Sequence, residues 1–304
     1  MEKTKCPIPV FIPLIVGIIA VSFSSIFVKL SDAPVSVQGM YRLLFTILFM
    51  LPFTKNQWKK AKLIQPKHWL LLFLSGTFLA LHFLLWMGSL KLTTVASSTI
   101  ILALQPVFVL IGAFFLFKER TSSASLMGMA IAICGAALIG WGDIGISAEN
   151  LLGDLLSLFG TLAVAVHMLI GQHLLRHIPS FFYSLAVFIS AVLVFALYNE
   201  AAGIPMTGYG GHDWLIFCLL AIIPTVFGHV LFNWLMNYVS ATTISVNILG
   251  EPVGASILAY FMLNESISLF QGAGGFLVCT GLYLFLKTSR VPDHIKEASV
   301  PQNV

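Results

Sequence analysis

Ten stretches of apolar residues follow one another along most of the 304-residue chain, and each is long enough to cross a lipid bilayer. A helix needs about 20 residues to span the hydrocarbon core, because each residue adds about 1.5 Å to its length. The stretches cover residues 9–30, 34–53, 69–90, 94–117, 123–141, 151–173, 180–199, 213–238, 242–263 and 267–287. The sequence therefore predicts an all-α integral membrane protein with ten transmembrane helices.

The composition excludes other classes of protein. Hydrophobic residues make up 58% of the chain and charged residues 9%, whereas soluble domains are about 45–50% apolar and about 25% charged. A disordered chain would need low hydrophobicity, and the net charge of +4 is too small for a nucleic-acid partner. The first apolar stretch exceeds the roughly 7–15 residues of a signal-peptide core, so we expect a retained helix.

The basic residues predict the orientation, because cytoplasmic loops of membrane proteins are enriched in lysine and arginine. With the N-terminus in the cytoplasm, the lysine cluster at 55–67 lies inside, as do Lys118 and Arg120, whereas only Lys29 and Lys91 lie outside. Ten spans then place both termini in the cytoplasm. We expect a multi-pass protein of the cell (cytoplasmic) membrane.

Two parts of the chain repeat each other. Gln105-Pro106 lies in LALQPVFVLIGAFFLFKER and Glu251-Pro252 in NILGEPVGASILAYFMLNES, an offset of 146 residues (252 − 106). The same offset relates Glu119 to Glu265, Gly128 to Gly274, and Gly135 to Gly281. The sequence therefore predicts a first five-helix repeat at 8–142, a second at 150–288, and a cytoplasmic tail at 289–304.

Five spans per repeat is an odd number, so the second repeat must enter the membrane inverted relative to the first. Inverted repeats are common in secondary transporters, whose substrate site lies near the midplane between the repeats. Inversion makes the two faces of the protein nearly equivalent, which offers a route to alternating access. Channels are also built this way, so a pore remains an alternative.

The chain resembles the drug/metabolite transporter superfamily, and most closely its EamA-type permeases, which include bacterial exporters of amino acids and related metabolites. The resemblance covers residues 8–287 and is strongest in LQPVFVLIGAFFLFKER and LGEPVGASILAYFMLNES, with Arg42 in the second span. It implies a helix bundle with a central cavity formed by both halves and no nucleotide-driven machinery. The chain departs from the family where Ser22 to Ser25 replace a frequent tryptophan early in the first span.

Glu251 is the only carboxylate near the middle of a predicted span. Ionisable groups are costly to bury in a membrane and by default indicate a transport pathway. Pro252 lacks a backbone donor and predicts a helix break beside Glu251, as Pro106 does beside Gln105. We therefore predict that Glu251 couples transport to protons; the alternative is a structural role, in which it pairs with Arg42 or caps broken backbone hydrogen bonds.

Other polar residues at comparable depth are candidates for substrate binding. Residues four apart share a helix face, as His82 and Trp86, His229 and Asn233, and Asn247 and Glu251 do. Arg42 either neutralises Glu251 or receives a substrate carboxylate, and hydrogen bonds between helices are the alternative for the uncharged residues. His167 stands alone on its span and is interpreted as structural. The predicted substrate-binding set is Arg42, His82, Trp86, Gln105, His229, Asn233 and Asn247.

The remaining patterns exclude most other chemistry. Gly128 and Gly135, like Gly274 and Gly281, are seven residues apart and indicate close helix packing, within the chain or in a homodimer. No metal-ligand spacing, Walker A sequence or G-x-S-x-G motif occurs in the sequence. We therefore expect no metal, no cofactor and no enzymatic activity.

These patterns together predict a secondary transporter in the lipid bilayer. Its expected substrate is a small organic metabolite, an amino acid or related compound or a drug-like cation, exported by alternating access. Protons are the predicted coupling ion. The alternatives are a pore for small solutes and, less favoured, a membrane-embedded enzyme.

Overall fold

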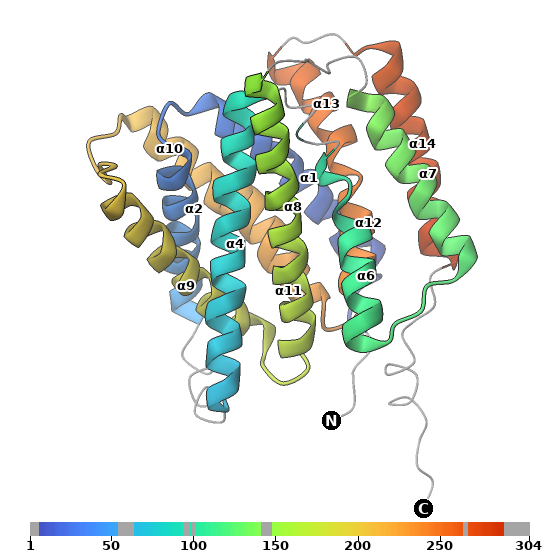
Figure 1. Ribbon diagram of the computed structural model, residues 1–304, viewed down its shortest axis with the longest axis horizontal. Helices are drawn as coiled ribbons and strands as arrows, with labels where there is room; N and C mark the ends of the chain where they lie inside the picture. Colours follow the sequence, from blue (N-terminus) through green and yellow to red (C-terminus); the bar gives the residue numbers. More distant parts are fainter. Residues whose placement is uncertain are drawn as a thin grey trace, which may run out of the picture.

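The computed structural model describes residues 6–53, 64–93, 98, 101–140, 148–263 and 267–288, and all regular structure in these ranges is helical (Figure 1). Eight helical stretches there are long and apolar enough to cross a membrane. This confirms the prediction of an all-α membrane protein with many spans.

The helices follow the apolar stretches of the sequence closely. In chain order they are α1 (Phe11–Leu30), α2 (Val35–Met50), η1 (Leu51–Phe53), α4 (Pro66–Leu92), α6 (Gln105–Phe117), α7 (Ser123–Gly140), α8 (Ala148–Leu174), α9 (Ser180–Ala201), α10 (Gly211–Leu220), η3 (Ala221–Val230), α11 (Leu231–Leu235), α12 (Ala241–Ile248), α13 (Glu251–Leu263) and α14 (Leu269–Thr288).

Two of the ten predicted spans contain apolar helices shorter than the others, Gln105–Phe117 and Ser123–Ile139. Part of the span predicted at 94–117 lies outside the described residues, as do most of the lysine cluster, Glu265 and the tail at 289–304. The number of ten spans therefore stays a prediction.

The two proline-containing pairs lie at helix starts, and Glu251-Pro252 lies in the middle of one stretch long enough to cross a membrane, Ala241–Met262. Helix α6 begins at Gln105, and α13 begins at Glu251 after a break that separates it from α12. Proline fits the first turn of a helix, where its missing N–H has no intrahelical partner to lose. Helices α6 and α13 run in opposite directions, toward the lower and the upper end of Figure 1.

The eighth predicted span is a continuous helix with a wider central part. Helix α10 leads into η3, a π-helical segment that contains Pro224, and then into α11. Thr225 in this segment donates a hydrogen bond through Oγ1 to the carbonyl of Leu220 at 2.7 Å. Such wide turns are rare and are often found at functional sites.

Helices α7 and α14 pack against each other along the right-hand edge of Figure 1. Their four sequence-predicted glycines face one another across this contact. A Cβ atom built on Gly274 would lie 2.6 Å from the carbonyl oxygen of Gly135, and one built on Gly281 would lie 2.5 Å from the backbone nitrogen of Ala132. The glycines therefore serve packing within the chain.

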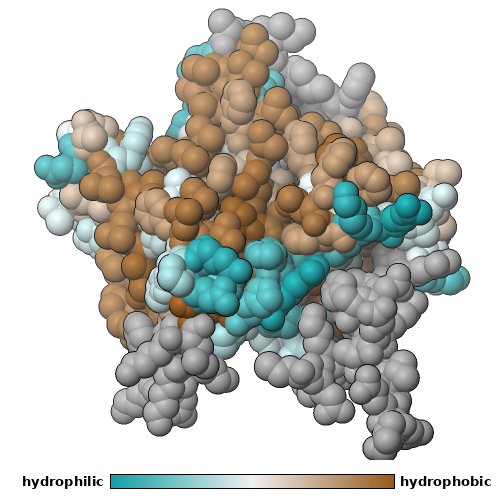
Figure 2. All heavy atoms as spheres, turned by 60° about the horizontal axis from the view of Figure 1, so that its bottom comes forward, coloured by the Kyte–Doolittle hydropathy of each residue, from teal (hydrophilic) through white to brown (hydrophobic). Residues whose placement is uncertain are grey.

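Much of the surface is apolar. Exposed side chains include Phe115 at 66%, Leu197 at 71% and Phe276 at 73%. Figure 2 shows apolar residues over most of the visible face, with hydrophilic residues gathered in a patch below them. Such an apolar exterior is stable in contact with lipid, where no water has to be ordered around it.

Candidate functional site

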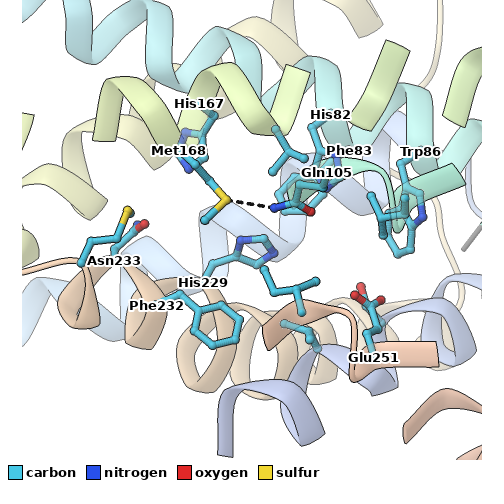
Figure 3. A pocket seen from close by; sticks show the side chains of 16 residues that line it. His82, Phe83, Trp86, Gln105, His167, Met168, His229, Phe232, Asn233 and Glu251 are labelled. Atoms are coloured by element: carbon cyan, nitrogen blue, oxygen red, sulfur yellow. Dashed lines mark hydrogen bonds between the residues drawn. The ribbon is translucent and has the colours of Figure 1, made fainter. Parts of the chain in front are cut away.

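A cavity lies inside the bundle, lined by residues of α1, α4, α6, α8, η3, α11, α12 and α13 (Figure 3). The cavity volume is about 50 Å³. Binding sites for small molecules are usually concave and mostly apolar, with a few polar groups that orient the ligand. The cavity therefore has the lining of a small-molecule site, and in this conformation it has room for only a few water molecules.

The starts of two helices meet at this cavity. Gln105 is the first residue of α6 and Glu251 is the first of α13, and both line the cavity. Broken helices whose N-termini point at the substrate are typical of secondary transporters. The first turns of both helices therefore place one amide and one carboxylate at the same site.

Glu251 is 5% exposed, and its carboxylate points into the cavity, toward the space between Gln105 and Trp86 (Figure 3). Its backbone carbonyl accepts a hydrogen bond from Ser22 Oγ at 3.3 Å, which fixes the start of α13 against α1. Within the described part of the chain, the carboxylate oxygens have no hydrogen-bond partner.

Arg42 does not line the cavity. Its side chain is fully buried, donates to Thr225 Oγ1 at 3.1 Å and to Ser24 Oγ at 3.3 Å, and lies 4.1 Å from the centre of the Phe83 ring. Phe83 itself lines the cavity. Arg42 therefore stacks on a wall residue. Among the described residues it makes no direct ion pair with Glu251, but the two charges interact electrostatically.

Three histidines reach the cavity from different helices. His82 Nδ1 lies 3.0 Å from the carbonyl oxygen of Gly160, and His167 Nδ1 lies 3.1 Å from that of Ser75. The ring of His229, on η3, packs edge-on against Phe83 with centroids 5.1 Å apart. These contacts hold all three rings at the wall of the cavity.

Two amides, an indole and the hydroxyl of Ser24 also belong to the polar lining. Gln105 Nε2 donates to Met168 Sδ at 2.9 Å, and Asn233 Nδ2 donates to Ser184 Oγ at 3.1 Å. Trp86 stacks on His82 with an interplanar angle of 10°, and its Nε1 is buried without a hydrogen-bond partner.

Comparison with known proteins decides the family. The model of the EamA-like transporter family matches residues 9–141 and again residues 151–287. The chain belongs to the EamA-like transporter family. It is therefore a multi-pass membrane protein of a transporter family, and its relatives are named as transporters and not as enzymes.

Several relatives of this EamA-family transporter are similar over most of their length. An uncharacterized transporter of Archaeoglobus fulgidus is 28% identical over 75% of this chain and 80% of its own. The uncharacterized transporter YetK of Bacillus subtilis is 26% identical over 72% and 67%. An uncharacterized transporter of Synechocystis sp. is 26% identical over 81% and 74%.

A solved crystal structure has the same fold as this EamA-family transporter. It superposes with a TM-score of 0.75 and covers 92% of this chain and 97% of its own. Because only 17% of the aligned residues are identical, the similarity extends to the fold alone.

The structure brings together most of the residues that the sequence singled out. His82, Trp86, Gln105, His229, Asn233 and Glu251 line the one cavity. Arg42 and Asn247 lie outside it; Asn247 Nδ2 donates to its own helix, at the carbonyl of Thr243, 2.7 Å away. Pro252 lines a smaller adjoining pocket, and Pro106 is buried in the first turn of α6.

Other wall residues had no signal in the sequence. His167, interpreted from the sequence as structural, lines the cavity, and so do Phe83, Met168 and Phe232. The Nδ1 atom of His167 also contacts Ser75 Oγ, and Ser75 Oγ in turn contacts the hydroxyl of Tyr183. Aromatic and methionine side chains on an apolar helix look the same in sequence whether they face lipid or a cavity.

A polar contact links three segments away from the cavity. Gln172 on α8 donates through Nε2 to Glu119, just past α6, at 2.8 Å, and its Oε1 accepts from the backbone nitrogen of Ala241, at the start of α12. Partial burial raises the pKa of Glu119 above its usual value, and Arg176 opposes this shift. In the described ranges, no cluster of histidine, cysteine or carboxylate side chains could hold a metal ion.

Proposed function

We propose that this EamA-family transporter exports a small organic metabolite across the cytoplasmic membrane by alternating access. The observation that carries the proposal is the cavity at the starts of α6 and α13, walled by residues of both segments that match the family. A mostly apolar cavity with a few polar groups supports a binding step for a small solute. An amino acid, a related compound or a drug-like cation would bind as the cavity opens during the transport cycle.

The proposed architecture is ten transmembrane helices in two inverted repeats, 8–142 and 150–288, followed by a cytoplasmic tail. The opposite directions of α6 and α13 support the inversion. Reporter tags should place both termini and residues 55–67 in the cytoplasm. Termini on opposite sides of the membrane would contradict the inverted arrangement.

The proposed substrate contacts are His82, Trp86, Gln105, His229 and Asn233, with Glu251 as the proton-coupling group. Arg42 and Asn247 act indirectly in this proposal, since both side chains are held by other parts of the protein. The rocking of the repeats around this cavity would expose it first to one side of the membrane and then to the other.

The proposed transport is tested with cells that overproduce or lack the protein. The metabolite content of the medium should differ between the two strains for at least one small solute. The purified protein in lipid vesicles should then exchange that solute across the membrane with saturable kinetics. Linear, unsaturable flux together with ionic conductance would instead indicate a pore.

Proton coupling predicts a specific effect of Glu251→Gln, which keeps the side-chain size and removes the titratable group. Net transport should lose its dependence on pH, because binding of a proton and of substrate at one site are linked. Exchange of substrate for substrate should persist, since it needs no proton step. Net transport and substrate exchange are measured in the same vesicles. An unchanged pH profile of net transport would contradict the coupling role of Glu251.

A further inference from the structure

The polar groups that line the cavity include one carboxylate, that of Glu251. It points into the open space and has no hydrogen-bond partner within the described part of the chain (Figure 3). An ionised carboxylate only accepts hydrogen bonds. A buried carboxylate without a partner is costly, so a ligand with donors and a positive charge would stabilise it.

The backbone contact of His82 indicates its tautomer. A carbonyl oxygen can only accept, so the nitrogen facing it must carry the hydrogen. This applies to His82 Nδ1 against the carbonyl of Gly160, and in the neutral ring Nε2 of His82 is then an acceptor. His167 Nδ1 contacts both the carbonyl oxygen and the hydroxyl of Ser75, so its contacts are compatible with either tautomer.

The two amides of the lining add further acceptors. Gln105 and Asn233 each use an N–H in a bond to a neighbouring side chain, Met168 and Ser184 respectively. Their carbonyl oxygens and their second N–H groups have no protein partner within the described residues, so each amide can both accept and donate. The indole N–H of Trp86 is a donor, but it is sealed from the cavity space.

The cavity also has only one charged lining residue. Glu251 is that residue, because Arg42 has no exposed surface and lies behind the ring of Phe83. A substrate carboxylate therefore cannot reach the guanidinium in this conformation. An anion in the cavity would lie against the carboxylate of Glu251, whereas the charge of Arg42 acts on Glu251 only from behind the wall.

The rest of the wall suits an apolar or aromatic group. Phe83, Trp86 and Phe232 line the cavity together with aliphatic side chains. Aromatic faces attract cations and pack well against other rings. Apolar groups and acceptors therefore lie in the same small volume.

We infer that the substrate is a monovalent organic cation that carries N–H donors, such as a primary ammonium, on an apolar or aromatic body. Its ammonium group binds Glu251, and its body lies among Phe83, Trp86 and Phe232. This inference rests on the proposed transport function, because it assigns the substrate class of the same cavity.

The test is a charge series of matched probes on the unaltered protein in lipid vesicles. The probes are 2-phenylethylammonium, the neutral 2-phenylethanol, the anion 3-phenylpropionate, the zwitterion phenylalanine, and trimethyl(2-phenylethyl)ammonium, which has no N–H. Calorimetry measures binding, and counterflow measures exchange. The primary ammonium should bind about tenfold or more tightly than each of the others, one factor of ten being about 1.4 kcal/mol.

Variants test the role of the carboxylate. Glu251→Gln should weaken binding of 2-phenylethylammonium about tenfold or more and leave 2-phenylethanol unaffected, and Glu251→Asp should retain part of the preference. The matched control is Glu200→Gln, which removes an exposed carboxylate at the end of α9. It should change neither the affinity for 2-phenylethylammonium nor the affinity for 2-phenylethanol. Because the probe series uses the unaltered protein, a misfolded variant does not weaken the test.

The outcomes separate the substrate class from the transport function. Exchange of the anion or the zwitterion with equal or higher affinity would overturn the cation class and leave transport intact. Absence of ammonium binding would also overturn the cation class. Binding that depends on Glu251 but gives no counterflow would support the ligand class and overturn transport through this cavity.

Discussion

Glu119 shows at the scale of one residue how burial of a carboxyl group makes stability depend on pH. It lies just past the end of α6, and burial raises its pKa, whereas Arg176 and the hydrogen bond from Gln172 lower it. A raised pKa in the folded protein means that folding favours the protonated carboxyl group. This contribution is present below the ordinary pKa of 4.5 and is lost as the pH rises through the raised pKa.

We therefore predict that Glu119→Gln makes the protein more stable than the wild type at pH 8. Glutamine has no charge to desolvate and can still accept the hydrogen bond from Gln172. The difference should shrink as the pH approaches 4.5, where the wild-type carboxyl group becomes protonated. Thermal unfolding in detergent across this pH range measures it, with Glu200→Gln as the exposed control. A difference in melting temperature that does not change with pH would contradict the assignment.

The depth of polar residues in the membrane could be predicted from the sequence, but their direction could not. Hydrophobic length placed Arg42, His82 and Glu251 at similar depths, and two of them line the cavity while Arg42 lies behind Phe83. The direction in which a side chain points depends on how its helix is rotated about its axis relative to the neighbouring helices. When all faces of a helix are apolar, the spacing of apolar residues in the sequence does not specify this rotation. His167 was interpreted as structural because it stands alone on its span, yet it lines the cavity.

Helix boundaries show what sequence can and cannot predict at the scale of elements. The apolar stretches located the described helices, and Glu251 lies inside the membrane-length stretch Ala241–Met262. Pro252, at the second position of α13, was the signal for a break beside Glu251. The residues at which α12 ends and α13 begins could not be predicted, because apolar residues continue on both sides of the break. Similarly, nothing in the sequence marked η3 as π-helical except Pro224.

The contact between α7 and α14 gives a prediction for an element pair. Gly274→Ala should destabilise the protein, because its Cβ would lie 2.6 Å from the Gly135 carbonyl oxygen and force the helices apart. Overpacking of this kind costs about 1–3 kcal/mol. Gly272→Ala on the same helix is the matched control, since a Cβ there has no neighbour within 4 Å.

Thermal unfolding of both variants in detergent measures the difference. Alanine is the better helix former at both positions by about 1 kcal/mol, so Gly272→Ala should be neutral or stabilising. Equal melting temperatures for the two variants would show that the close approach of α7 and α14 does not contribute to stability.

At the scale of the whole molecule, both segments that match the family contribute to one cavity. Residues of α1, α4 and α6 come from the first segment, and those of α8, η3, α11, α12 and α13 from the second. A site shared in this way changes its exposure when one segment moves against the other. A rigid arrangement with a permanent opening to both sides would instead act as a pore.

Accessibility of a cavity residue from each side of the membrane tests alternating access most directly. Val164 on α8 lines the cavity and is close in size to cysteine. With the native cysteines replaced by serine, Val164→Cys should react with a membrane-impermeant thiol reagent applied from either side. The reaction from each side should be slowed by a transported solute, and the membrane should show no conductance. Reaction from only one side under every condition, or fast reaction from both sides together with conductance, would contradict alternating access.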